Sequence, residues 1–162
     1  MRLRQHVSNP HSKEEMTQFL NEAIAEARLG LSEGGIPIGS VLVRDGKIIG
    51  RGHNRRVQNN NPTAHAEIEC LKNAGRMNDY ADTVLYSTLM PCAMCAGAAV
   101  QFKVSVVVAG ENRTFKSASD WMESMGTEVI DMDSDECFQM LADFAKAQPD
   151  VWNEDIGIPT KK

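Results

Sequence analysis

The chain has 162 residues, of which 42% are hydrophobic and 24% are charged, and its formal net charge is −5 at pH 7. This length suffices to bury most of the apolar surface in one core. The acidic balance does not favour a nucleic-acid partner, because phosphate binding usually needs a basic face. No apolar run approaches the ~20 residues of a membrane span, and the basic N-terminus lacks the apolar stretch of a secretory signal. Four cysteines are few for a disulfide scaffold, so we expect a cytoplasmic protein.

Local sequence signals divide the chain into alternating helices and strands. Ser12 and Glu15 form a capping box that starts a helix, and a second capping box at Asp133 introduces the closing helix. Asp45-Gly46 is typical of a two-residue hairpin turn, and Pro91 suits the first turn of a helix, where its missing N–H costs nothing. In chain order we expect a helix over 16–31, strands over 38–44 and 47–52, a helix over 65–76, a strand over 83–88, a helix over 91–103, a strand over 104–109, a short helix over 119–125, a strand over 128–131 and a helix from 133.

This order of elements predicts an α/β fold. Right-handed crossovers would place helices on both faces of one sheet, giving a three-layer α/β/α sandwich around a mixed five-stranded sheet. No repeat, low-complexity segment or long linker divides the chain. We therefore expect a flexible tail over residues 1–12 and a single domain over residues 13–162.

Two short motifs supply a set of metal ligands. His65-Ala66-Glu67 and Pro91-Cys92-Ala93-Met94-Cys95 match the H-x-E and P-C-x-x-C pattern that recurs in zinc-dependent deaminases. One imidazole and two thiolates are three of the four ligands of a tetrahedral Zn²⁺, and the position left for water is typical of a catalytic site. Cys92 and Cys95 share a helix face, and a helix N-terminus favours the thiolate form. Glu67 lies two residues from the ligand histidine, where it can carry protons to and from that water.

Each motif alone has a simpler interpretation. An isolated H-A-E tripeptide on a helix carries no function, and an isolated C-x-x-C can be redox-active or half of a structural zinc site. A structural zinc module would lack its fourth ligand here and would leave Glu67 without a role. The two motifs together therefore favour a catalytic zinc, while Cys70 and Cys137 are expected to be small core residues.

Longer stretches around these motifs resemble the cytidine and deoxycytidylate deaminase superfamily over most of the chain. Gly52-His53-Asn54, Pro62–Glu67 and Thr88–Cys92 are similar to sequences shared with the tRNA adenosine deaminases. Gly110–Ser117 and Val151–Gly157 instead resemble the fungal-type cytosine deaminases. The resemblance implies a cytidine deaminase-like fold and a zinc-dependent hydrolase that acts on the C–N bond of a cyclic amidine, with a free base as substrate.

The resemblance also assigns roles to residues around the expected zinc site. Asn54 is expected to bind the base, because an amide donates and accepts at once, and Asp155 to accept a hydrogen bond near the exocyclic amine. Phe115 and Trp152 are expected to pack against the flat ring. The segment over residues 148–157 is expected to cover the pocket as a lid. The other residues expected to contact the base are Ile36, Ala66, Leu89 and Met90.

For this site we expect hydrolysis of cytosine to uracil and ammonia, a step of pyrimidine salvage. Water activated by Zn²⁺ would attack C4 while Glu67 carries a proton to the adjacent ring nitrogen and then to the leaving amine. Met90 and Ala93 depart from the residues usual beside the first ligand cysteine of the fungal enzymes. Guanine, isocytosine, or adenosine within a tRNA therefore stay open as substrates, although the acidic net charge favours a free base.

A run of small residues on the second motif helix bears on the oligomeric state. The residues at 96–99 are Ala, Gly, Ala and Ala, which allow another element to approach closely. Packing of this helix on its own sheet explains the run equally well. The resemblance to dimeric fungal-type enzymes favours a homodimer.

Overall fold

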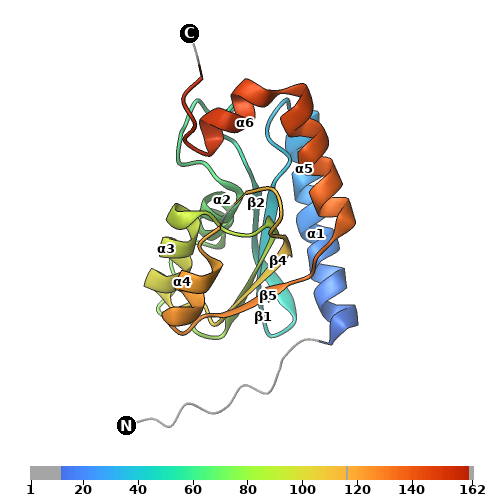
Figure 1. Ribbon diagram of the computed structural model, residues 1–162. Coiled ribbons are helices and arrows are strands. Elements are labelled where there is room, and N and C mark those ends of the chain that lie inside the picture. Colours follow the sequence, from blue (N-terminus) through green and yellow to red (C-terminus); the bar gives the residue numbers. More distant parts are fainter. Residues whose placement is uncertain (1–11, 116, 161–162) are drawn as a thin grey trace, which may run out of the picture.

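The computed structural model describes residues 12–115 and 117–160, and it shows one mixed five-stranded sheet with helices on both faces (Figure 1). The tail predicted for residues 1–12 lies, apart from Ser12, outside the described residues. The predicted three-layer α/β/α architecture is confirmed. In chain order the elements are α1 (Lys13–Ser32), β1 (Gly39–Arg44), β2 (Lys47–His53), α2 (Ala66–Ala74), β3 (Thr83–Leu89), α3 (Ala93–Phe102), β4 (Val106–Glu111), α4 (Ser119–Ser124), β5 (Glu128–Asp131), α5 (Asp135–Ala147) and α6 (Pro149–Asp155).

The sheet has the strand order β2-β1-β3-β4-β5. β1 is antiparallel to both of its neighbours, whereas β3, β4 and β5 run parallel. Asp45 and Gly46 form the predicted hairpin turn, with φ values of 50° and 71°, and positive φ at both central residues is what a type I′ turn requires. Since β2, β3 and β4 point the same way, the chain leaves all three at one edge of the sheet, and α2 and α3 begin there.

Alternation along the central strands divides the core into two layers, because successive side chains of a strand point to opposite faces. Leu42, Leu85 and Val107 pack on one face with Cys70 of α2 and Met122 of α4. The cluster on the other face, beneath α1, contains Val41, Val43, Val84, Tyr86, Val106 and Val108. Figure 1 accordingly shows α1 and α5 on one side of the sheet and α2, α3 and α4 on the other. Within the described ranges, no helix is both long and apolar enough to cross a membrane.

A third apolar cluster closes the edge of the sheet where α2 and α3 begin. Ile36 and Ile38, from the segment before β1, pack there with Phe144 of α5 and Trp152 of α6. α6 follows α5 after a single residue, Gln148, and lies across this end of the molecule (Figure 1). The chain therefore returns, near its C-terminal end, to the edge of the sheet that carries the metal-binding motifs.

Three local details differ from the predictions. Pro91 precedes α3 instead of occupying its first turn, because Cys92 has the extended conformation of an N-cap. The cap of α5 is Ser134, whose side chain accepts a hydrogen bond from the backbone N–H of Cys137. Asp133 cannot take that role, since its φ of 49° places it in the left-handed region one residue earlier. No helix was predicted for the segment that forms α6.

Candidate active site and metal centre

Two helix N-termini at one edge of the sheet carry the metal-binding motifs. His65 is the N-cap residue of α2, Cys92 is that of α3, and Cys95 follows in the first turn of α3. Gly52 of β2 allows α2 to pack closely on the sheet, since a Cβ at this position would lie 2.6 Å from the backbone nitrogen of Cys70. The fold thus places the ends of the two helices side by side.

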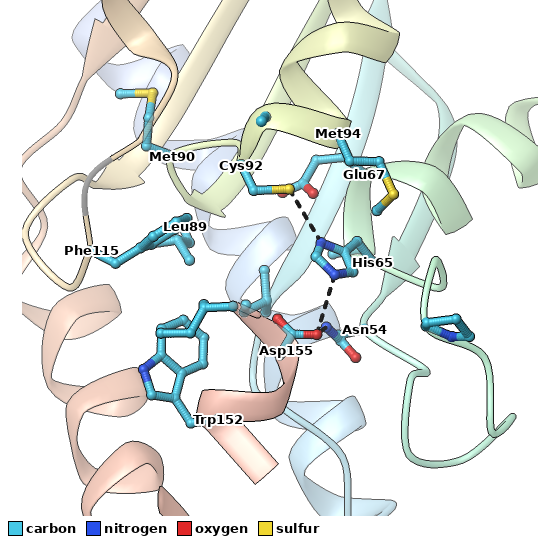
Figure 2. Close-up of a pocket in the computed structure, with 15 residues that line it drawn as sticks. Asn54, His65, Glu67, Leu89, Met90, Cys92, Met94, Phe115, Trp152 and Asp155 are labelled. Carbon is cyan, nitrogen blue, oxygen red and sulfur yellow. Dashed lines mark hydrogen bonds and ion pairs between the residues drawn. The ribbon is translucent and has the colours of Figure 1, made fainter. Parts of the chain in front are cut away.

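The three predicted ligands form a compact donor set. The ligand atoms of His65, Cys92 and Cys95 all lie within 4.8 Å of one another, and Nδ1 of His65 is 3.5 Å from Sγ of Cys92 (Figure 2). A tetrahedral Zn²⁺ with Zn–S of about 2.3 Å and Zn–N of about 2.05 Å separates sulfur from nitrogen by about 3.6 Å. The side chains therefore fit a zinc ion as they stand, with one coordination position left for water.

The charges of these groups also suit a cation. Burial opposes a positive charge on His65, but its hydrogen bonds to Asp155 and Cys92 outweigh that effect and raise the pKa of His65 to about 10. The hydrogen bond from Cys95 lowers the pKa of the Cys92 thiol to about 4, against the opposing effect of burial. The same contact and burial raise the pKa of Cys95 well above its usual range. Without metal, the site holds a thiolate beside an imidazolium, and a divalent cation can replace the protons.

The other two cysteines have a different chemistry. Burial raises the pKa of Cys70 to about 12 and that of Cys137 to about 11. Both side chains lie in apolar clusters, Cys70 beneath α2 and Cys137 between α1 and α5. These contacts agree with their predicted role as core residues.

Asp155 of α6 contacts the metal-binding histidine from the side opposite to the cysteines. Its Oδ1 lies 3.2 Å from Nε2 of His65 and accepts a hydrogen bond from Nδ2 of Asn54 at 3.3 Å (Figure 2). A carboxylate that accepts the second N–H of a ligand histidine fixes the tautomer and the orientation of the ring. Asp155 therefore joins the expected base-binding amide to the expected metal ligand.

Glu67 lies in the first turn of α2, and its side chain is buried. Its Oε1 accepts a short hydrogen bond from the hydroxyl of Ser87 on β3. Burial raises the pKa of Glu67, and the hydrogen bonds from Cys95 and Ser87 only partly offset this. A carboxyl group with a raised pKa can both take up and deliver a proton near neutral pH, as general acid–base catalysis requires.

Four polar side chains of the site, together with Cys92, line a cavity of about 340 Å³ (Figure 2): Asn54, His65, Glu67 and Asp155. Phe115 and three residues at the C-terminal end, Trp152, Asp155 and Ile156, line the part contributed by the β4–α4 loop and α6. The rings of Phe115 and Trp152 meet edge to face, with centroids 6.1 Å apart and planes inclined at 82°. The volume is near the lower end of the ~300–1,000 Å³ found for ligand sites, so it suits a small flat ligand.

The structure brings most of the expected base-contacting residues to this cavity. Asn54, Ala66 and Leu89 all line it. Ile36 is fully buried behind the wall, in the cluster that contains Trp152, and Ile38 lines the cavity in its place. Met90 borders the cavity, but its side chain points away from Trp152 (Figure 2) into the core cluster beneath α2 and α3.

The sequence did not lead us to predict several residues of the site. Ser87 was missed, although strand alternation places it on the same face of β3 as Leu85, toward α2. Met94 lies between the two cysteines, and its position on the open side of the first turn of α3 could have been read from the helical period. The remaining lining residues that were missed are Ile38, Pro62, Ala93 and Ile156.

Comparison with known proteins places these observations in a family. Residues 13–111 match the model of the cytidine and deoxycytidylate deaminase zinc-binding region. The chain is 41% identical over 141 residues to a cytosine deaminase of Candida albicans, an alignment that covers 85% of this chain and 94% of the relative. It is 39% identical over 125 residues to a tRNA-specific adenosine deaminase of Streptococcus pyogenes, covering 75% of this chain and 79% of the relative.

A solved structure supports the same assignment. A structure from studies of A-to-I editing by tRNA:A34 deaminases superposes with a TM-score of 0.70 at 30% identity, covering 77% of this chain and 99% of that one. The chain belongs to the cytidine and deoxycytidylate deaminase family. It is a hydrolytic deaminase with Zn²⁺ as its cofactor.

Proposed function

We propose that this deaminase acts on a free nucleobase and converts cytosine and water to uracil and ammonia, as an enzyme of pyrimidine salvage. The observation that carries the proposal is the position of α6, because Trp152, Asp155 and Ile156 line the cavity and reduce it to about 340 Å³. A bare pyrimidine ring fits such a space, and on this proposal a ribose or a nucleotide chain attached to the ring would clash with α6. The Candida albicans cytosine deaminase, aligned over 85% of this chain, supports the same substrate.

The polar groups of the cavity suit a cytosine ring. Nδ2 of Asn54 has a second hydrogen for the carbonyl oxygen of the base. Ala66, which lines the same cavity, begins α2, where backbone N–H groups have no partner within the helix and can donate to a ligand. Asp155 uses Oδ1 for its contacts with Asn54 and His65, so Oδ2 can accept a hydrogen from the exocyclic amine. Phe115 and Trp152 supply apolar surface beside the ring.

Glu67 is placed to move the protons of the reaction. When Zn²⁺ is bound, it lowers the pKa of a coordinated water to about 7 and so supplies the nucleophile. Glu67 takes the proton of that water and delivers it to the ring nitrogen next to the attacked carbon. It would then take the proton of the new hydroxyl group on that carbon and pass it to the amine, so that the C–N bond breaks, the carbonyl forms and ammonia leaves. Ser87 holds Oε1 of Glu67, which leaves Oε2 to make these transfers.

Ammonia release from a panel of substrates tests the proposal. The panel contains cytosine, 5-methylcytosine, isocytosine, guanine, adenine, cytidine and a tRNA. We expect cytosine to be preferred over cytidine by at least ~10³ in kcat/KM, because a covered cavity excludes the sugar sterically. If guanine or isocytosine were the best substrate, the enzyme would still be a free-base deaminase, but its substrate would not be cytosine. Comparable rates on cytidine would contradict the proposal.

The relatives that act on tRNA support a second candidate, deamination of an adenosine in a tRNA loop. The Streptococcus pyogenes relative and the tRNA:A34 deaminase structure share the metal-binding family with this chain. The net charge of −5 is against this candidate, since a tRNA-binding surface needs basic residues near the cavity. Inosine formation in the tRNA arm of the panel, at a rate above that of cytosine deamination, would establish it instead.

We also propose a homodimer that uses α3 and α4. These neighbouring helices (Figure 1) expose large apolar side chains: Met94 is 37%, Phe102 47%, Trp121 45% and Met125 57% exposed. A second copy would cover such a surface. Light scattering at micromolar concentration should give twice the chain mass, and Phe102→Glu should give the mass of one chain. A wild-type protein that scatters as a monomer would contradict the dimer.

A further inference from the structure

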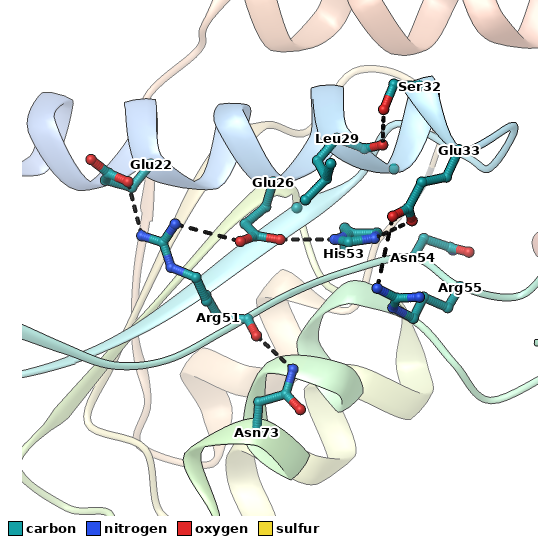
Figure 3. Close-up of polar contacts among 12 residues, drawn as sticks. Glu22, Glu26, Leu29, Ser32, Glu33, Arg51, His53, Asn54, Arg55 and Asn73 are labelled. Carbon is teal, nitrogen blue, oxygen red and sulfur yellow. Dashed lines mark hydrogen bonds and ion pairs between the residues drawn. The ribbon is translucent and has the colours of Figure 1, made fainter. Parts of the chain in front are cut away.

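The residue before the expected base-binding amide is held between two carboxylates. His53 ends β2, and its side chain is only 4% exposed. Nδ1 of His53 lies 2.8 Å from Oε2 of Glu26, and Nε2 lies 2.7 Å from Oε1 of Glu33 (Figure 3). Both carboxylates belong to α1 or its C-cap, so the imidazole joins the end of β2 to the C-terminal half of α1.

The two contacts together define the charge of His53. A neutral imidazole has one N–H and one lone pair, and its lone pair would then face a carboxylate. With both carboxylates ionised, two acceptors at hydrogen-bond distance are matched by a donor at each ring nitrogen, which is the imidazolium form. The hydrogen bond from His53 is also the main cause that lowers the pKa of Glu33, against the opposing effect of burial.

A charged His53 would balance the charges of the groups around it. Arg51 of β2 donates to Glu22 at 2.8 Å and to Glu26 at 3.5 Å. Arg55, from the loop after β2, lies 3.9 Å from Glu33. Figure 3 shows these groups in one row along α1. Three carboxylates thus face two guanidinium groups, and the imidazolium supplies the third positive charge.

A glycine in α1 leaves space for the imidazole ring of His53. Gly30 lies inside α1, where glycine is less favourable than alanine. A Cβ at Gly30 would lie 3.0 Å from Cδ2 of His53, which is tighter than ordinary van der Waals contact. The glycine therefore lets the imidazole lie against the helix backbone between its two partners.

The same contacts determine where Asn54 lies. Its backbone N–H donates to the carbonyl oxygen of Ile38 at 2.9 Å, and its carbonyl oxygen accepts from Gln58 at 3.2 Å. Nε2 of Gln58 is in turn 3.4 Å from Oε1 of Glu33, the oxygen that His53 contacts. The backbone on both sides of Asn54 is thus fastened, through His53 and Gln58, to the end of α1.

We propose that the His53 imidazolium is a positioning residue for base recognition. Clamped between Glu26 and Glu33, it fixes the end of β2 and thereby directs the Asn54 amide into the cavity. It acts through Asn54 and touches neither substrate nor metal. The inference rests on the proposed function for the substrate with which it is measured.

A mutant cycle tests the coupling between His53 and Asn54. With the best substrate of the panel, His53→Gln and Glu33→Gln should each raise KM roughly tenfold and change kcat less than about threefold, because binding of the base is what loosens. Glu22→Gln is the matched control, as it removes a carboxylate of the same row that does not touch His53, and its KM should stay that of the wild type. In an Asn54→Ala background, His53→Gln should raise KM no further. Additive effects, or an equal effect of Glu22→Gln, would overturn the proposal.

A spectroscopic measurement tests the charge without any substrate. In ¹⁵N–¹H spectra of the zinc-loaded protein at pH 7, both ring nitrogens of His53 should carry hydrogens, with signals assigned by their loss in His53→Gln. A ring with one protonated nitrogen would overturn the charged clamp. If no base in the substrate panel were deaminated, the proposed function would be refuted. The protonation of His53 and the zinc content would still be measured, because neither measurement needs a substrate.

Discussion

The catalytic side and the covering side of the cavity are built in different ways. His65, Glu67 and Cys92 come from the first turns of two helices that start at one edge of the sheet. On the covering side, Asp155 meets Asn54 across 101 residues of sequence. Local helix geometry places the metal ligands and the proposed proton carrier, whereas long-range packing of α6 places the groups that we propose select the substrate.

The family match follows the same division. It spans residues 13–111, which include the metal ligands and Glu67, and ends before Phe115 and α6. Relatives with different substrates can therefore share this part of the chain, as the cytosine and tRNA adenosine deaminases at 41% and 39% identity do. Changes on the catalytic side should abolish the reaction, and changes on the covering side should alter its rate and selectivity.

The largest effect is expected from a metal ligand. Cys92→Ala removes one of three protein ligands, so elemental analysis should show zinc lost and ammonia release should fall below detection. Cys137→Ala is the matched control and should retain one zinc per chain, because Cys137 lies in the core between α1 and α5. Stoichiometric zinc in Cys92→Ala would refute the ligand assignment.

Glu67→Gln should be the next most severe change. The amide keeps the shape of the side chain but cannot carry a proton, so kcat should fall by at least ~10³ while zinc stays bound. Glu69→Gln removes the other carboxylate of the first turn of α2, which lies 3.9 Å from Lys72 and outside the cavity lining, and it should leave kcat nearly unchanged. Near-normal turnover of Glu67→Gln would mean that another group moves the protons.

Truncation from Val151 onward examines the covering side. Removing Trp152 and Asp155 should lower kcat/KM for cytosine by roughly 10², since the base is no longer confined and His65 loses its partner, while zinc is retained. The preference for cytosine over cytidine should narrow at the same time. Removing only residues 159–162 should change neither value. A fully active truncation at 151 would show that α6 is a structural cap, and Met90 would then be the next residue to test for substrate choice.

The smallest effect is expected from Ser87→Ala, which removes one hydrogen bond to Glu67. A net hydrogen bond of about 1 kcal/mol corresponds to a fall in kcat of roughly five- to tenfold, with zinc and KM unchanged. Ser40→Ala is the control, because its buried hydroxyl donates to the carbonyl oxygen of Tyr86 away from the cavity. Equal losses in both variants would show a general weakening of the sheet.

Much of the fold could be predicted because its signals are local. Hydrophobic period, capping residues and the Asp45-Gly46 turn each act within a few positions, and right-handed crossovers then place helices on both faces of one sheet. The errors at Pro91 and Asp133 are shifts of two residues and one residue in where a helix begins, which only the backbone conformation distinguishes. The helix α6 was missed because its seven residues contain a single buried side chain, Trp152, and so show no period.

The site divides in the same way. Ligand spacing predicts His65, Cys92 and Cys95, since a turn of helix and an N-cap fix where such side chains lie. It does not show that Asp155 turns toward His65, nor that Ile38 replaces Ile36 at the wall. Those contacts depend on how α6 packs across the sheet edge, and the spacing of residues along a single helix or strand does not predict them.

The unequal acidities of the four cysteines make metal loss a hazard for this enzyme. Alkylating agents and peroxides react with thiolates. Cys70 and Cys137, whose pKa values are about 12 and 11, are protonated at neutral pH and therefore react slowly. Cys92, with a pKa of about 4 and a partly exposed side chain, is protected only while its sulfur is bound to zinc. Brief iodoacetamide treatment of the stripped protein would therefore modify one cysteine of the four and block reconstitution.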